Sequence, residues 1–407
     1  MRTAILCDQV LDGTARPPLR GGAVVVEDSR IVSVGAATDA ELAGAEVIDA
    51  GHRTLLPGLL DSHVHTYGFH SRSSPPTGTP EEVARNVLDV VRGLEQLARS
   101  GVAAVRDCGY PHHAIFAVRE AAESGLFPSP RLLLCGRAIS ASGGHGTSIS
   151  VPADGVDAVR RAVRLECKAG ADWIKLMVTG GTATPGELVS DVQLTPEEIA
   201  AAVDEAHRRG KKVCAHCSNL AGTKAAIRAG VDSVEHGIEL DDEAIQLMLE
   251  RGTWLSAGLK CTEVEGVNRA QDLVPEFVAR KAGTIYQTQM ASFRRAVAAG
   301  VSVSAATDGG PSYFPLSGRS LARELSFMAE LGLTPAQVIE VATRATAGLL
   351  GLHDTGTLAE GKRADLLVVD GDPLRDLMDL DKPWLVMLGG HLVRRPRDGA
   401  ARRLAGG

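Results

Sequence analysis

Two histidines separated by one residue are the first sign of chemistry in this sequence. The segment 55–66 reads L-L-P-G-L-L-D-S-H-V-H-T, so an apolar run leads into His63 and His65. Alternate side chains of a strand point to the same face, about 6–7 Å apart, and two imidazoles at that spacing can bind one cation. The chain has 12 histidines, so the pair alone is a weak indication, and an exposed strand face would explain it equally well.

Other residues able to bind a metal stand in or at the ends of separate apolar segments. They are Lys175 in W-I-K-L-M-V-T-G-G, His216 in K-V-C-A-H-C, His236 in S-V-E-H-G and Asp308 in S-A-A-T-D-G-G. Each of these residues has a plain structural explanation by itself. Their recurrence at the ends of successive strand candidates is what indicates a shared site.

Lys175 is the most informative of these residues, because a lysine inside an apolar strand is costly to bury as a charge. One explanation is a side chain that extends its amine to the mouth of the fold. The alternative is an amine that has added carbon dioxide to become a carbamate. A carbamate is an anion that could bridge two metal ions, and such ions turn water into a strong nucleophile near neutral pH.

The elements that would position these residues alternate between apolar strands and helices. Strand candidates cover residues 59–65, 103–107, 132–136, 173–178, 212–216, 233–236, 253–257 and 302–307. Helices are expected over residues 80–99, 154–168, 196–209, 220–229, 242–250 and 275–299. Eight such units over roughly 290 residues fit an α/β fold of the (β/α)8 TIM-barrel type, whose sites form at the C-terminal ends of the strands.

Both ends of the chain are instead rich in short strands. The candidates are residues 4–7, 22–27, 30–34 and 46–49, and then 356–358, 365–370, 384–388 and 391–394. We expect them to meet in one small β-sandwich domain that is discontinuous in sequence. The predicted boundaries are 1–57 and 355–407 for this domain and 58–354 for the barrel.

The composition is that of a globular protein with 44% hydrophobic and 23% charged residues. A net charge of −7 argues against a nucleic-acid or anionic-membrane surface. Seven scattered cysteines do not suggest a disulfide framework, and the C-x-x-C around His216 is best explained by core packing. We expect a cytoplasmic protein with a small-molecule substrate, no nucleic-acid or membrane partner, and a homo-oligomeric state.

Several motifs resemble the amidohydrolase superfamily over essentially the whole chain. These are the opening P-G-L-L-D-S-H-V-H and the closing T-G-T-L-A-E-G-K-R-A-D-L-L-V-V-D of residues 355–370. More narrowly, S-G-G-H-G, G-A-D-W-I-K-L-M-V-T-G-G and V-E-H-G resemble one branch of it. That branch contains metal-dependent prolidases, Xaa-Arg and Xaa-Lys carboxypeptidases and ochratoxinase-type amidases, often called imidazolonepropionase-like.

The resemblance implies a binuclear, usually zinc, centre that activates a hydroxide to hydrolyse an amide bond in a dipeptide or N-acyl amino acid. The more buried metal would be held by His63, His65 and Asp308, and the more exposed one by His216 and His236. Carboxylated Lys175 and the hydroxide would bridge the two ions. These assignments are carried by the matching motifs and are expectations for this chain.

Further residues are expected to act on the substrate. Asp308 would take a proton from the nucleophile and pass it to the leaving amine. The resemblance implies that His145, in a glycine-rich loop, stabilises the oxyanion or holds a carboxylate. Arg72 could bind an acid group, and Tyr313 could shape the pocket. The chain departs from many relatives after His216, where Cys217-Ser218-Asn219 replaces a substrate-contacting aromatic residue or histidine.

Three other functions stay open on the sequence. A deaminase or cyclic-amide (imidazolone) hydrolase would share the fold, but mononuclear deaminases carry H-x-x-E at the fifth strand, where this chain has Asn219. An ester, lactone or organophosphate hydrolase would use the same binuclear centre. A non-catalytic barrel would predict a broken ligand set, whereas all the expected ligands are present.

Overall fold

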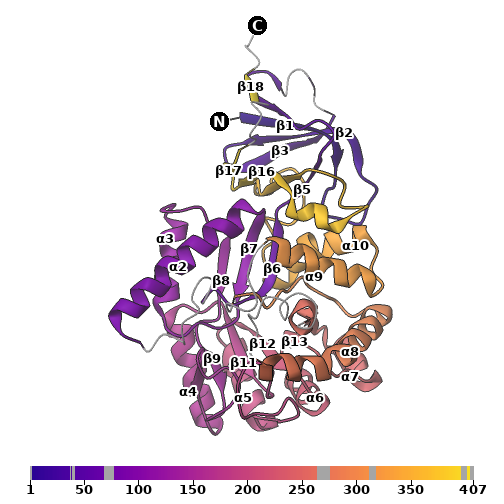
Figure 1. Cartoon of the computed structure of the whole chain (residues 1–407). Coiled ribbons are helices and arrows are strands. Elements are labelled where there is room, and N and C mark those ends of the chain that lie inside the picture. Colours follow the sequence, from indigo (N-terminus) through magenta and orange to yellow (C-terminus); the bar gives the residue numbers. More distant parts are fainter. Residues whose placement is uncertain are drawn as a thin grey trace.

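The structure is a computed structural model that describes residues 2–36, 38, 42–67, 78–263, 276–310, 318–395 and 401–403. Its described strands form two regions, a sheet built from both chain ends and an inner set of strands surrounded by helices (Figure 1). The first and last described strands of the chain both lie in this terminal sheet, away from the helices.

The terminal sheet has nine described strands. They are β1 (Arg2–Val10), β2 (Leu19–Glu27), β3 (Arg30–Gly35), β4 (Glu46–Asp49), β5 (Thr54–Pro57), β15 (Leu366–Val369), β16 (Pro383–Leu388), β17 (His391–Arg394) and β18 (Ala401–Arg403). Strands β5 and β15 pair antiparallel with Leu56 opposite Leu367, which joins the two ends of the chain. One face packs a buried cluster that includes Ile5, Val24 and Leu385.

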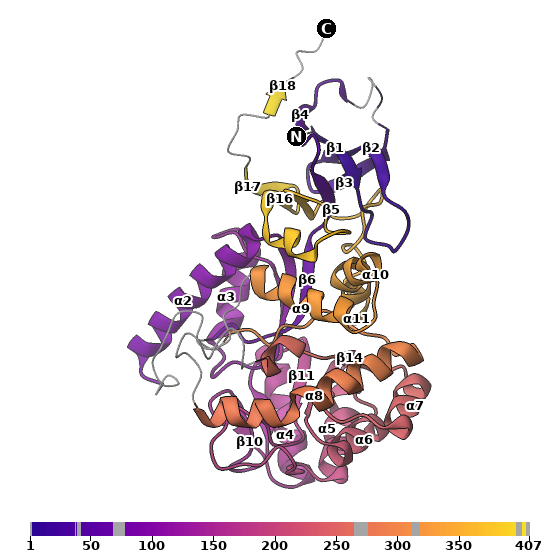
Figure 2. The same ribbon diagram turned by 45° about the vertical axis from the view of Figure 1, so that its right-hand side comes forward.

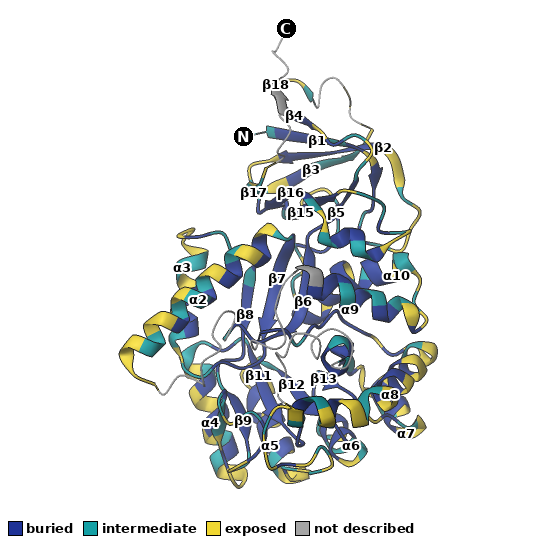
Figure 3. Ribbon diagram, in the orientation of Figure 1, coloured by how far each residue is buried: buried dark blue, intermediate teal, exposed yellow. Residues whose placement is uncertain are grey.

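The inner strands pair in parallel, as expected for strands connected by helices. They are β6 (Leu59–Val64), β7 (Val102–Asp107), β8 (Arg131–Leu134), β9 (Ala138–Ser140), β10 (Ser150–Pro152), β11 (Trp173–Met177), β12 (Lys212–Cys217), β13 (Ser233–His236) and β14 (Trp254–Ser256). Apart from β10, these strands are almost wholly buried, because helices cover them (Figure 3). The arrangement is an α/β fold of the TIM-barrel type.

Ten described α-helices cover the strands and connect them (Figure 2). They are α2 (Pro80–Arg99), α3 (Ala114–Glu123), α4 (Val156–Ala169), α5 (Pro196–His207), α6 (Leu220–Ala229), α7 (Asp242–Arg251), α8 (Glu276–Ala299), α9 (Gly318–Glu330), α10 (Pro335–Glu340) and α11 (Thr346–Leu350). The start of α2 follows from its sequence, since the Thr79 side chain accepts the Glu82 N–H and Pro80 occupies the first turn. Among the described helices, none is both long and apolar enough to cross a membrane.

Short helical turns of other types complete these connections. They are η1 (Leu259–Thr262), η3 (Val341–Ala345) and η4 (Leu377–Asp381).

Two predicted strands were wrong. Residues 302–307 form isolated bridges, with Val303 opposite Leu255 and, just beyond the segment, Gly309 opposite Val64. Two backbone N–H groups that would bond to a neighbouring strand bond to side chains instead. The Thr307 N–H donates to Asp61 Oδ1 and the Ala305 N–H to the Thr346 hydroxyl. The segment 356–358 is a turn, in which Gly356 adopts φ +83°.

Candidate metal centre

Three predicted ligands converge where β6 and the 302–307 segment end. The Nε2 atoms of His63 and His65 lie 3.3 and 3.2 Å from Oδ1 of Asp308. One ligand atom from each of the three residues lies within 4.8 Å of the others. Donors bound about 2.1 Å from one ion are themselves about 3.0–3.4 Å apart, so this spacing suits a single divalent cation.

The rings of His216 and His236 lie beside this cluster. Their centroids are 4.7 Å apart, and the His236 ring is 5.2 Å from the His63 ring. Burial lowers the pKa of His236 to about 3. Burial, assisted by the charges of His145, His236 and Lys175, holds the pKa of His216 well below its usual value. Both imidazoles are therefore neutral near pH 7, which is the form that binds a metal.

Backbone carbonyls orient two of the histidine rings. His65 Nδ1 lies 3.2 Å from the carbonyl oxygen of Gly109, which leaves its Nε2 facing Asp308. His216 Nε2 lies 3.2 Å from the carbonyl oxygen of Gly180 and 3.0 Å from the Ser218 hydroxyl. A ring nitrogen that donates to a carbonyl leaves the other nitrogen with a free lone pair, so His216 would offer Nδ1 to a metal.

Lys175 is buried in β11, with only 1% of its surface exposed. It lies opposite Cys214 in the pairing with β12, and therefore on the same inner face as His216 two residues further on. Burial opposes its charge, but the surrounding Cys108, Glu235, Cys214 and Asp308 outweigh burial and raise the pKa of the amine. The structure thus places Lys175 inside the fold among the other predicted ligands, and not at an exposed mouth.

Two of the predicted ligands have strained backbones. His236 has φ 70° and Asp308 has φ 49°, and among the described residues Asp28 is the only other non-glycine residue with positive φ. Side chains with a Cβ rarely adopt this region, and such strain is concentrated at functional sites. Neighbouring contacts hold Asp308 in place, since its N–H donates to the carbonyl oxygen of His63.

His145 lies against this cluster through ring stacking. Its ring is 4.3 Å from that of His216, at 25° between the planes. Its Nδ1 contacts Oε1 of Glu187, which also accepts the Gly181 N–H at 2.9 Å. Burial alone would raise the pKa of Glu187, but the His145 ring and the hydrogen bonds of Gly181 and Gln193 lower it. The anionic carboxylate therefore orients the His145 ring through Nδ1.

Arg72 and Tyr313 lie outside the described residues. Asn219 has a structural role, because its side chain accepts the Gly222 N–H at the start of α6 and donates to the carbonyl oxygens of Val189 and Asp191. The two cysteines of the C-x-x-C are both buried, but Cys214 and Cys217 belong to different core clusters.

The sequence reasoning missed three charged residues of this region. Glu235 Oε2 lies 2.7 Å from His63 Nδ1, Arg106 contacts the other oxygen of Glu235, and Glu187 holds His145. Two of them had a recognisable signal. Glu235 directly precedes a predicted ligand, and Arg106 is a charge inside the apolar strand V-A-A-V-R-D.

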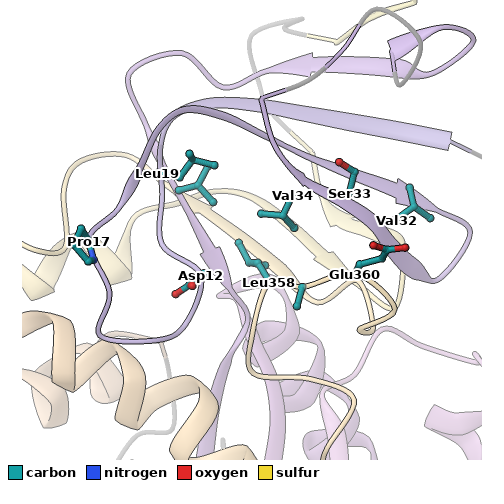
Figure 4. A pocket seen from close by; sticks show the side chains of 10 residues that line it. Asp12, Pro17, Leu19, Val32, Ser33, Val34, Leu358 and Glu360 are labelled. Atoms are coloured by element: carbon teal, nitrogen blue, oxygen red, sulfur yellow. The ribbon is translucent and has the colours of Figure 1, made fainter.

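One hollow lies elsewhere, on the terminal sheet. It encloses about 530 Å³ and is lined by residues of β1, β2, β3 and the 358–360 turn, including Leu19, Val34 and Leu358 (Figure 4). Its only carboxylates are those of Asp12 and Glu360. None of its lining residues is a predicted site residue.

A buried cluster of histidines, an aspartate and a lysine at the ends of parallel inner strands is the arrangement expected of a metal-assisted hydrolase. Comparison with protein families agrees. The amidohydrolase family model matches residues 54–393, and the chain belongs to this family. It is a hydrolase that acts on carbon–nitrogen bonds.

Individual relatives narrow the family to one branch. The chain is 31% identical to a protein named ochratoxinase from Aspergillus niger, over 93% of this chain and 84% of that one. Its fold is similar to that of a Xaa-Pro dipeptidase with bound methionine, with a TM-score of 0.84 and 30% identity over 96% of this chain and 99% of that one. It is also similar to a prolidase in complex with N-methylphosphonate-L-proline, with a TM-score of 0.87 and 28% identity over 97% and 100% of the chains.

Proposed function

We propose that this protein is a metal-dependent amide hydrolase that acts on a dipeptide or an N-acyl amino acid. Two divalent ions, most simply zinc, would be held by His63, His65, His216, His236, Asp308 and a carboxylated Lys175. The observation that carries the proposal is the convergence of His63, His65 and Asp308 at the spacing of ligands to one ion.

The donor set fits a metal on a second ground. Both ring nitrogens of His63 are buried without a hydrogen-bond partner, and His63 as a whole is only 1% exposed. Burying a polar atom without a partner is costly, and a cation coordinated by Nε2 would remove that cost for this nitrogen. Imidazole and carboxylate donors at neutral pH are typical zinc ligands.

A bound divalent ion would supply Lewis acidity, which polarises an amide carbonyl and lowers the pKa of water. A residue of the chain would transfer the proton from the attacking water to the leaving nitrogen. Burial would raise the pKa of Asp308, but the His63, His65 and His236 rings outweigh burial and hold it well below its usual value. Asp308 is therefore ionised at neutral pH, can accept a proton from the attacking water, and can return it to the leaving nitrogen.

His145, whose ring stacks on that of His216, would contact the substrate. With Nδ1 held by Glu187, its Nε2 can donate to the developing oxyanion or to a substrate carboxylate. Arg72 and Tyr313 are proposed as further substrate contacts. The substrate class is supported by the dipeptidase and prolidase similarity and by the ochratoxinase similarity.

The cyclic-amide alternative has support of its own, because imidazolonepropionase from Geobacillus sp. is 26% identical over 86% of this chain and 84% of that one. Deaminases and ester, lactone or organophosphate hydrolases remain alternatives on the same scaffold. The buried Lys175 on the same face as His216 favours a binuclear centre, and therefore the amide hydrolase over a mononuclear deaminase.

We also propose that the inner strands close into a complete (β/α)8 barrel over residues 58–354, flanked by a β-sandwich of residues 1–57 and 355–407. Hydrogen bonds support closure, since the Leu255 N–H donates to the carbonyl oxygen of Ser302 and the Ser62 N–H to that of Ala305. The segment near residue 304 thus bonds to β14 on one side and β6 on the other.

The test is a hydrolysis screen of zinc-loaded protein with metal content measured on the same sample. Xaa-Pro and Xaa-Arg dipeptides and N-acyl amino acids form the test set, and lactones, cyclic amides and organophosphates form the comparison set. About two ions per chain with cleavage of the test set would support the proposal. A single ion per chain, or activity confined to cyclic amides, would replace it with the cyclic-amide hydrolase.

A further inference from the structure

A buried ion pair of Arg106 and Glu235 lies next to the predicted metal ligand His63. Arg106, on β7, has no exposed surface, and its guanidinium lies 4.4 Å above the Trp173 ring. Glu235, on β13, is also fully buried. Glu235 lies next in sequence to His236 but contacts His63, a ligand from a different strand. A buried ion pair is costly unless it is well bonded, so its position beside a predicted metal ligand needs an explanation.

The Arg106 guanidinium is fixed at every nitrogen. Its Nε donates to the carbonyl oxygen of Ser62 at 2.6 Å and its Nη1 to the Ser233 hydroxyl at 3.1 Å. Its Nη2 donates to Glu235 Oε1 at 2.7 Å, and the Ser233 hydroxyl donates to the same oxygen at 2.5 Å. These contacts hold the Glu235 carboxylate in a single orientation.

The second oxygen of that carboxylate faces His63. Glu235 Oε2 and His63 Nδ1 are 2.7 Å apart, although the contact lacks the angles of a hydrogen bond and leaves both atoms without another partner. The opposite ring nitrogen, Nε2, is the one that lies 3.3 Å from Asp308. A small rotation of the imidazole would align Nδ1–H with the carboxylate while Nε2 stays directed at Asp308.

We infer that Glu235, locked by Arg106, is a positioning residue that keeps the proton of His63 on Nδ1 and directs the Nε2 lone pair at the metal. This inference rests on the proposed function. A carboxylate behind a ligating histidine fixes the tautomer, orients the ring and makes the ligand more basic. Here the carboxylate comes from the β13 strand and the histidine from β6, so Arg106, Ser233 and Glu235 together set the geometry of a ligand that none of them adjoins in sequence.

The inference is tested by metal binding to the metal-free full-length protein. Co²⁺ would be titrated into the wild type, Glu235→Gln and Glu166→Gln, with a chelating indicator reporting free metal. Glu166 is a matched control, because it is equally buried and also pairs with an arginine and a histidine, Arg137 and His113. Glu235→Gln should weaken binding about 10–100-fold, whereas Glu166→Gln should bind as the wild type does. Affinity of Glu235→Gln within twofold of the wild type would overturn the inference.

Glu235→Gln also leaves Arg106 buried without its carboxylate, which can unfold the protein. The double variant Arg106→Gln/Glu235→Gln removes both charges and should keep the fold, shown by an unchanged circular dichroism spectrum, while still binding Co²⁺ more weakly. Wild-type affinity in the folded double variant would contradict the inference.

A spectroscopic measurement needs no substitution at Glu235. In zinc-loaded wild type, ¹⁵N–¹H correlation of the imidazoles, with His63 assigned through His63→Gln, should find the proton on Nδ1 and the metal on Nε2. Zinc on Nδ1, together with Glu235 and Cys108 whose ligand atoms lie within 4.8 Å, would overturn the inference but keep a metal centre. Failure of the wild type to bind any metal would overturn the proposed function itself.

Discussion

His63 Nε2 and Asp308 Oδ1 lie 3.3 Å apart, although His63 belongs to β6 and Asp308 follows the last inner segment of the chain. The two backbones are joined as well, because the Asp308 N–H donates to the carbonyl oxygen of His63. The first and last inner segments therefore meet at the site. A change in either one should alter metal binding before it alters the fold as a whole.

Lys175→Ala should remove one of two bound ions and lower amide hydrolysis about 100-fold or more, because the bridging anion would be lost. Lys224→Ala is the control, since Lys224 pairs only with Asp241 and Glu243 in the described structure. Metal content and kcat/KM would be measured on both variants. Two ions and full activity in Lys175→Ala would show that the lysine is not a bridge.

Gly181→Ala should displace the His145 ring, because a Cβ at Gly181 would lie 2.4 Å from His145 Cε1. We expect kcat/KM to fall about 10–100-fold through misplacement of a substrate-contacting group, with metal content unchanged. In Gly348→Ala the new Cβ would meet no atom within 4 Å, so it serves as the control. Equal kinetics in the two variants would remove His145 from the proposed substrate contacts.

Removal of the metal by a chelator should abolish hydrolysis and leave the secondary structure intact. Added zinc should restore activity and raise the thermal midpoint, because a ligand that binds only the folded state at 100 times its Kd stabilises it by about 2.7 kcal/mol. Activity, circular dichroism and thermal unfolding would be followed on one preparation. Persistent activity after complete removal of metal would contradict the metal-dependent mechanism.

Glu324 should make stability depend on pH. Its carboxyl is fully buried and accepts hydrogen bonds from the N–H groups of Leu259 and Lys260. Burial raises the pKa of this carboxyl from 4.5 to about 8, although the two hydrogen bonds lower it in part. Between these two values the folded state holds a proton that the unfolded chain has lost. Stability should therefore fall as pH rises from about 4.5 to about 8, by up to a few kcal/mol.

The measurement is urea unfolding of the wild type and Glu324→Gln across that pH range. Titrations common to both proteins cancel in their difference, so the stability of the wild type relative to the variant should decline with rising pH. A difference that stays constant with pH would show that Glu324 keeps an ordinary pKa in the folded state.

Much of the fold was predictable because its signals are local. The helix at 220–229 was predicted with the observed bounds, since Asn219 caps it and Gly230 ends it. The segment 302–307 was predicted as a strand from its apolar pattern. It forms only isolated bridges, because Asp61 and Thr346, which are distant in sequence, take two of its backbone donors.

The candidate ligands could also be found from the sequence. His63, His65, His216, His236 and Asp308 stand at the ends of apolar segments, and a parallel arrangement of strands brings such ends together. Their roles in metal binding and the substrate contacts of Arg72 and Tyr313 stay predictions. The interpretation of Lys175 needed its burial and its place opposite Cys214 before an exposed lysine could be set aside.

The sequence by itself determined most of the strands and helices around the site and which residue types stand at their ends, because periodicity and capping act over a few residues. Only the tertiary structure decided that Glu235 on β13 contacts His63 on β6, that Arg106 locks it, and that Glu187 holds His145. These contacts join segments far apart in the chain. Their pairing depends on strand register and on the twist of the assembled sheet, which no local pattern encodes.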